Sequence, residues 1–196
     1  MSGYDAMTGA DGACAANGRA VVVLGMHRSG TSVLAHGLEA LGVDLGGQLL
    51  DGHDDNPDGY FEDRQVVATS ERLLQALGIG WDSAALPAQD CWQQPLVRRL
   101  QAEIAADLRG RFGASPLWGF KDPRVIRTLP FWLQVLDDLA VEVHFVLSLR
   151  NPLSVAHSLA RRNDIALEKG LLLWLVHWLP YLELLRGRTL VVVDYD

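Results

Sequence analysis

Two hydrophobic patterns alternate along the chain. Short, continuous apolar runs predict strands buried on both faces, and they cover residues 20–24, 117–121, 141–149 and 190–193. Longer segments with an apolar residue at every third or fourth position predict helices, and they cover residues 31–41, 62–77, 95–112, 130–139, 153–162 and 165–185. Such alternation is typical of an α/β domain. We therefore expect three layers, with a mainly parallel sheet of four or five strands and helices on both faces.

The ends of this pattern set the expected domain limits. Residues 1–18 are small and polar, and they lack the basic start and apolar run of a signal peptide. They predict a disordered leader in front of one domain over residues 19–196. The most apolar stretch, residues 171–185, is interrupted by His177, Pro180 and Glu183, so it favours a buried helix over a membrane span. We expect a cytoplasmic protein.

Composition narrows the classes of function. The net charge of −7 over 196 residues argues against a nucleic-acid-binding surface, because such surfaces need clustered Lys and Arg. Cys14 and Cys91 are too few and too far apart for a disulfide framework or a metal cluster, and they predict idle thiols in a reducing compartment. The acidic loop of residues 51–58 fits neither an EF-hand nor a zinc site. We expect this loop to be solvated, and we expect no metal.

The sharpest local motif lies between the first expected strand and the first expected helix. It reads Gly25-Met-His-Arg28-Ser-Gly30-Thr31-Ser32. Glycines let such a loop curl with its N–H groups inward, and the helix N-terminus that follows attracts an anion. A nucleotide P-loop has a lysine where this chain has Thr31, and the cation here is instead Arg28. The motif predicts a P-loop-like fold that binds a smaller anion load than ATP; a plain tight turn and a kinase or GTPase loop stay open as alternatives.

A second candidate anion site follows the strand over residues 141–149. Arg150 stands at the strand end and Ser158 eight positions later, two turns into a helix that Pro152 can start without losing a needed donor. Both side chains can face one pocket at the carboxyl edge of the sheet, where α/β proteins bind ligands. Arginine suits a bidentate phosphate contact, although an arginine that only caps the sheet edge has the same pattern.

Together the two motifs resemble the signature of the sulfotransferases that use 3′-phosphoadenylyl sulfate, particularly their bacterial branch. The resemblance runs from about Ala20 to Asp196 and includes the strand that ends in Tyr195-Asp196. It implies that Arg150 and Ser158 hold the 3′-phosphate, and that the 5′-phosphosulfate is held by the loop residues Arg28, Ser29, Gly30, Thr31 and Ser32. The family's usual helices and Gly/Lys-containing loop after the last strand are missing from the sequence. Three alternatives follow: a truncated chain, a missing piece supplied by a partner, or an inactive protein.

Two further segments resemble family stretches with catalytic roles. In the segment Trp118–Arg124, Lys121 is expected to stabilise charge on the leaving phosphate together with Arg28, and Arg124 to bind cofactor or acceptor. In the segment Asn56–Arg64, Glu62 at a helix start is expected to be the general base, kept ionised by Arg28 and Lys121. Asp58 and Asp63 are the alternative bases. A surface turn at Asp122 and an acid placed by the helix dipole are the purely structural interpretations.

The expected function is transfer of a sulfuryl group from 3′-phosphoadenylyl sulfate to an acceptor hydroxyl or amine. The acceptor, a small molecule, carbohydrate, lipid or peptide, would be bound by the loops over residues 51–60 and 79–92. One alternative is a P-loop phosphotransferase in which Asp194, at a strand end, binds Mg²⁺. Another is a non-catalytic nucleotide-binding module. The oligomeric state is open.

Overall fold

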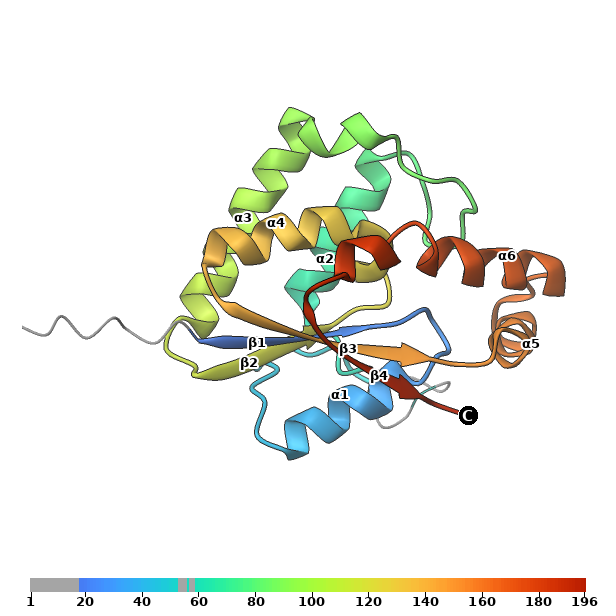
Figure 1. The fold of residues 1–196 in the computed structure, drawn as a ribbon, viewed down its shortest axis with the longest axis horizontal. Helices are drawn as coiled ribbons and strands as arrows, with labels where there is room; N and C mark the ends of the chain where they lie inside the picture. The colour runs from blue at the N-terminus through green and yellow to red at the C-terminus, as the bar shows by residue number, and fades with distance from the viewer. Residues whose placement is uncertain (1–17, 53–55, 57–58) are drawn as a thin grey trace, which may run out of the picture.

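The centre of the molecule is a sheet of four parallel strands (Figure 1). The computed structural model describes residues 18–52, 56 and 59–196, so the expected leader lies almost wholly outside the described residues. In space the strands follow the order β2-β1-β3-β4, with the bounds β1 (Arg19–Leu24), β2 (Leu117–Lys121), β3 (Glu142–Leu149) and β4 (Thr189–Asp194). The expected α/β class and parallel sheet are confirmed.

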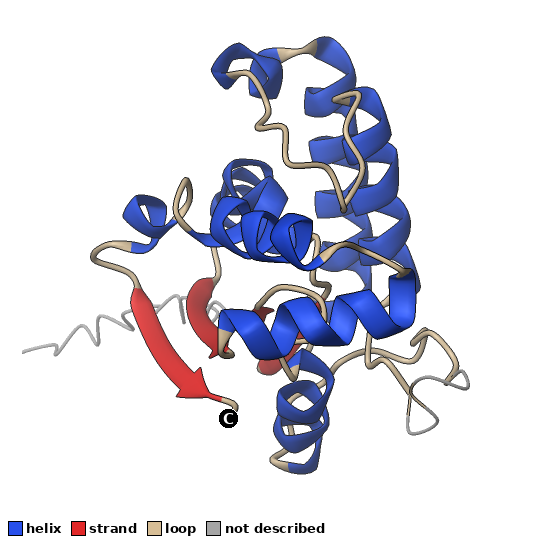
Figure 2. Ribbon diagram, turned by 90° about the vertical axis from the view of Figure 1, so that its right-hand side faces the viewer, coloured by secondary structure: helices blue, strands red, loops and turns tan. Residues whose placement is uncertain are grey.

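Helices cover both faces of the sheet, which gives the three expected layers (Figures 1 and 2). One face carries α1 (Thr31–Ala40). The other face carries α2 (Arg64–Ala76), α3 (Pro95–Phe112) and α4 (Leu129–Leu139). Next to the carboxyl end of β3, α5 (Pro152–Asn163) packs against α6 (Leu167–Trp178). Three short 3-10 turns complete the chain: η1 (Gln89–Gln93), η2 (Val125–Thr128) and η3 (Leu182–Leu185).

The continuous apolar runs arise because alternate strand residues enter two different cores. Ala20 and Val22 of β1 face the larger core, where they meet Phe120 of β2 among residues of α2, α3 and α4. Val21 faces the other way and packs with Ala35 of α1. Both faces of β1 are therefore buried, as expected for a strand in the middle of the sheet.

The segment over residues 165–185 differs from its expected form as one buried helix. It divides into α6 and η3, with Pro180 between them, because proline cannot continue the hydrogen-bond ladder of a helix. Its inner side is buried, but its outer side carries exposed leucines at positions 172, 175 and 179. No helix of the described chain is both long and apolar enough to cross a membrane.

The two edges of the sheet are treated differently. Along the outer edge of β2, Asp44 donates its amide to the carbonyl of Leu117 at 3.1 Å and accepts the amide of Gly119 at 2.9 Å. Four of the five residues of β2 are buried. Along the outer edge of β4, no strand pairs within the described residues, and Val191 and Val192 are 58% and 53% exposed. Figure 2 shows β4 standing clear at one side of the molecule.

Candidate functional site

The carboxyl ends of β1, β2 and β3 border one cavity of about 320 Å³. Among the described residues, its lining contains five cationic side chains and one carboxylate: Arg28, Lys121, Arg124, Arg150, Arg162 and Glu62. Gly30, Thr31 and Ser32 of the loop after β1 line it as well. The cavity thus lies where parallel α/β sheets bind ligands, and it is strongly cationic in a chain whose net charge is −7.

The loop between β1 and α1 is built for close approach of a ligand to its backbone. Arg28 and Gly30 have φ angles of 68° and 81°, so the chain curls twice through the left-handed region before α1 begins. The amides of Gly30, Thr31 and Ser32 donate no hydrogen bond within the described residues. A side chain at position 30 would collide with the ring of Tyr195, because a Cβ there would lie 2.1 Å from that ring. Ser29 is buried outside the cavity lining, and its carbonyl accepts the hydroxyl of Ser148.

Arg28, Arg150 and Ser158 form one hydrogen-bonded cluster, of which Arg28 and Arg150 line the cavity and Ser158 is outside the lining. The Nε of Arg28 donates to Oγ of Ser158 at 2.9 Å, and Nη1 of Arg150 donates to the carbonyl oxygen of Arg28 at 2.9 Å. The structure therefore joins Arg28 to residues that the resemblance assigns to a different phosphate. Arg150 also stacks over the ring of Tyr195, with 5.2 Å from its guanidinium carbon to the ring centroid.

Lys121 and Glu62 also line the cavity, and they form a buried ion pair. Lys121 Nζ lies 2.6 Å from Oε1 of Glu62, 2.9 Å from the carbonyl of Tyr60 and 3.2 Å from Oγ of Ser32. Its side chain is only 1% exposed. The three N–H groups of the ammonium therefore all have acceptors, and a ligand oxygen would contact Lys121 by replacing the Ser32 hydroxyl.

Burial is the largest cause of the pKa shifts of Glu62 and Lys121. It raises the pKa of Glu62 above its ordinary value, although Lys121 and Arg124 act in the opposite direction. It also lowers the pKa of Lys121, against the attraction of Glu62. The sequence-based expectation was that the neighbouring cations dominate and hold the carboxylate in its ionised form. In the structure burial has the larger effect on the pKa and raises it, which makes Glu62 a stronger base than an exposed glutamate. This direction leaves the expected ionisation at neutral pH a prediction.

The three candidate bases take different places. Glu62 lines the cavity but precedes α2, whose first residue is Arg64. Asp63 is the cap of α2: its Oδ1 accepts the amides of the second and third helix residues, and Arg111 binds both its carboxylate oxygens. Asp63 therefore has a structural role and is not part of the cavity lining. Asp58 lies outside the described residues.

Compared with models of protein families and with curated proteins, the chain matches none. Its function therefore has to be inferred from the cavity itself. The side chains there come from β2, α1, α5 and the segments that follow β1, α1, β2, β3 and β4. Arg124 is among them as a cation that lies 3.7 Å from Glu62 and 2.8 Å from Asp122. Asp194 ends β4 outside the cavity lining and accepts the amide of Asp196.

Three lining residues did not stand out in the sequence. Tyr195 belongs to the strand that is last in the sequence, and only the pairing of β4 with β3 brings it to the loop after β1. Arg162, near the end of α5, reaches the cavity because of the direction of that helix. His27 lies inside the motif but has no assigned role there. Its ring packs 4.5 Å from that of Trp81, and burial and nearby cations hold its pKa well below the usual value.

Proposed function

We propose that the cavity binds 3′-phosphoadenylyl sulfate and that the protein transfers its sulfuryl group to an acceptor hydroxyl or amine. The observation that carries the proposal is that, in the described part of the chain, five cationic side chains and one carboxylate line one cavity of an acidic protein. A donor with charged groups at both its 3′- and 5′-positions fits a cavity whose lining has two groups of cations, one around Arg150 and Arg28 and one around Lys121 and Arg124. The resemblance of the loop after β1 to the sulfotransferase signature supports the same ligand.

The protein's own carboxylate supports an oxyanion site beside Arg150. Asp196 accepts the Asn151 amide at 2.6 Å and the Nε of Arg150 at 3.2 Å. Asn151 is the cap of α5, so these donors combine a helix N-terminus with a guanidinium. A 3′-phosphate would meet the same donors by displacing the Asp196 carboxylate. The side chain of Arg28, which Ser158 holds by a hydrogen bond, lies in the same cluster as Arg150.

The lining residues around Lys121 and Glu62 are suited to sulfuryl transfer. The acceptor oxygen or nitrogen would form a bond to sulfur while the bond between sulfur and the bridging oxygen of the 5′-phosphate breaks. The acceptor's proton would pass to Glu62, whose raised pKa suits that role. The negative charge left on the 5′-phosphate would face Lys121 and the amides of Gly30, Thr31 and Ser32.

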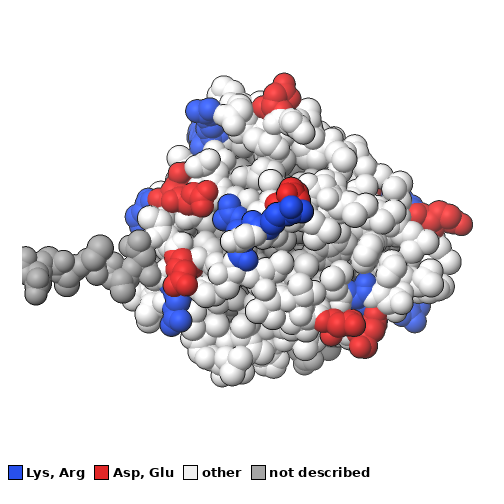
Figure 3. Space-filling view, in the orientation of Figure 1, with Lys and Arg blue, Asp and Glu red and all other residues white. Residues whose placement is uncertain are grey.

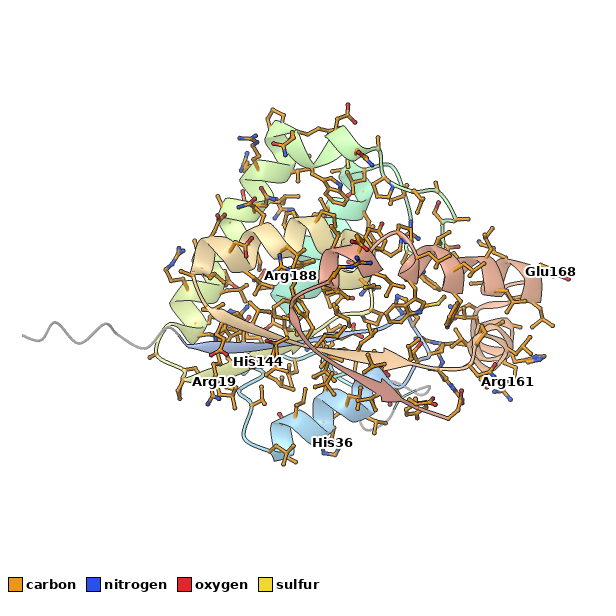
Figure 4. All side chains as sticks on the ribbon, viewed as in Figure 1. Arg19, His36, His144, Arg161, Glu168 and Arg188 are labelled. Carbon is orange, nitrogen blue, oxygen red and sulfur yellow. The ribbon has the colours of Figure 1, made fainter. Side chains whose placement is uncertain are left out.

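A binding experiment tests the ligand. We expect Arg150→Ala to weaken adenosine 3′,5′-bisphosphate binding about tenfold to a hundredfold, since a hydrogen bond to a charged group contributes roughly 1.5–3 kcal/mol. The affinity for adenosine 5′-monophosphate should not change. Arg28→Ala should weaken the binding of both ligands, because the resemblance assigns Arg28 to the 5′-phosphate, which both ligands carry. Metal-free calorimetry measures these affinities, with Arg161→Ala, an exposed arginine on α5 outside the cavity lining (labelled in Figure 4), as the control.

Two results would overturn this ligand assignment. One is the absence of bisphosphate binding by the unaltered protein without metal, which would return the phosphotransferase alternative. The other is an equal loss of both ligands in Arg150→Ala.

A turnover experiment tests the chemistry. Glu62→Gln should slow release of adenosine 3′,5′-bisphosphate from the donor by roughly 10²–10⁴-fold in the presence of alcohol or amine acceptors, with little change in bisphosphate affinity. The matched control is Glu71→Gln, because Glu71 also pairs with Arg124, at 3.2 Å, but is exposed and outside the cavity lining. Bisphosphate binding without turnover for any acceptor class would favour the non-catalytic alternative.

A further inference from the structure

The outer edge of β4 is an unprotected template for strand pairing. Proteins normally shield such edges with lysines, prolines, bulges or a covering segment. The edge of β2 has a cover in Asp44, but β4 has none of these devices within the described residues. Four apolar residues, Leu190 to Val193, follow one another in the strand. An edge of this kind is typical of an interface with another strand.

Within the part of the chain that the structure describes, the charged residues at the two ends of β4 have no ionic partners. Arg188, just before the strand, donates its Nε to the carbonyl of Leu184 at 3.1 Å, and no carboxylate pairs with it among the described residues. Asp194, at the other end, accepts only the amide of Asp196 there. Figure 3 shows basic atoms near the start of β4, acidic atoms near its end and an uncharged surface between them, and Figure 4 labels Arg188 where η3 leads into β4.

The order of charged and apolar residues along β4 is self-complementary in an antiparallel pair of β4 strands. An antiparallel pair of β4 strands centred on Val191 places Arg188 of each copy opposite Asp194 of the other. The same register places Leu190 opposite Val192 and Thr189 opposite Val193. Residues opposite each other in an antiparallel pair share a face, so the apolar and the charged pairs both form on matching sides.

We propose that a second copy of this chain occupies the edge, and that two molecules pair through antiparallel β4 strands about a two-fold axis at Val191. The two sheets then become one continuous sheet of eight strands. Self-pairing satisfies the row of backbone donors and acceptors on each edge and covers the exposed valines at positions 191 and 192. Another protein would have to supply the same order of charges and apolar residues by coincidence.

The oligomeric state tests the interface. We expect sedimentation to show a dimer of the unaltered chain that dissociates on dilution. Val191→Lys should leave only monomer, because the two-fold axis places the introduced charges against each other. Val191 is more than half exposed, so its replacement should not impair folding, which circular dichroism will check. The control is Leu41→Lys, which changes an even more exposed apolar residue, 81% exposed, at the end of α1 and should stay dimeric.

Charge reversal tests the register. Arg188→Asp and Asp194→Arg should each weaken the dimer about tenfold, because every dimer contains two such cross-strand pairs. The double variant should restore the original affinity. Val191→Cys should form an intermolecular disulfide on mild oxidation, since directly opposite residues approach within disulfide range. A chain that stays monomeric at all concentrations, a dimer that survives Val191→Lys, or a double variant as weak as the single ones would each overturn the proposal.

Discussion

Removal of the Lys121 ammonium should destabilise the folded protein by an amount that can be calculated from the titration of Glu62. In Lys121→Met the side chain keeps nearly the same length, but the Glu62 carboxylate loses the cation that lies 2.6 Å from it. A buried carboxylate without its partner escapes by taking up a proton. Protonation of a carboxyl group with the ordinary pKa of 4.5 costs about 1.36 kcal/mol for each pH unit above that pKa, which is about 3.4 kcal/mol at about pH 7. Arg124, at 3.7 Å, offsets part of that, so we expect a loss of about 2–3 kcal/mol.

The sign of the pH dependence distinguishes this cause from lost packing. The folded variant holds a proton on Glu62 that the unfolded chain has released, so its deficit shrinks as the pH falls towards 4.5. At about pH 5 the remaining proton-uptake cost is roughly 0.7 kcal/mol. Urea unfolding of the variant and the unaltered protein at both pH values measures the difference.

A matched double variant completes the experiment. Glu62→Gln combined with Lys121→Met removes both charges, so its stability should lie within about 1 kcal/mol of the unaltered protein and should show no extra pH dependence between the two measurements. If Lys121→Met loses the same free energy at both pH values, Glu62 is not a buried carboxylate facing Lys121, and its assignment as general base loses its electrostatic basis.

Two further predictions concern groups beside the site. Burial depresses the pKa of His177 from 6.5 to about 3, so the folded state excludes a proton that the unfolded chain binds, and stability is lost as the pH falls below 6.5. His177→Gln should remove about 2 kcal/mol of the acid destabilisation between about pH 6.5 and pH 5 in urea unfolding, and an unchanged slope would contradict the depressed pKa. Gly30→Ala should lose about 1–2 kcal/mol through its left-handed φ alone, and more through the collision with Tyr195, and should weaken bisphosphate binding in calorimetry. Gly37→Ala, where a methyl group meets nothing within 4 Å inside α1, should instead gain about 0.5–1 kcal/mol, and a similar effect at both glycines would refute the explanation.

The strands and most helices were predictable because their signals are local. A continuous apolar run buried on both faces has few alternatives, and α3 begins at Pro95 and ends at Phe112 as its pattern predicts. The division at Pro180 was also visible in the sequence, but the apolar residues on both sides of it outweighed the proline. The exposed leucines of α6 could not be predicted, since an apolar residue on an outer face has the same sequence signal as one in the core.

The site was predictable only where one motif holds the residues together. The loop after β1 needed no distant information. Glu62 and Asp63 are adjacent acids before a helix, and either can be a cap or a base by sequence. Arg111 of α3 and Lys121 of β2 decide between them, by binding Asp63 and Glu62 respectively. Such choices depend on partners far along the chain, which no local pattern contains.

The contact between Tyr195 and Gly30 has a consequence for how the protein is made. The loop after β1 leaves the ribosome well before β4, and domains acquire such long-range contacts late. Until β4 pairs with β3, the ring of Tyr195 is not over the loop and Arg150 lacks the stacking and carboxylate contacts that orient it. A growing chain therefore carries an incomplete loop after β1 until β4 has been made and has paired with β3.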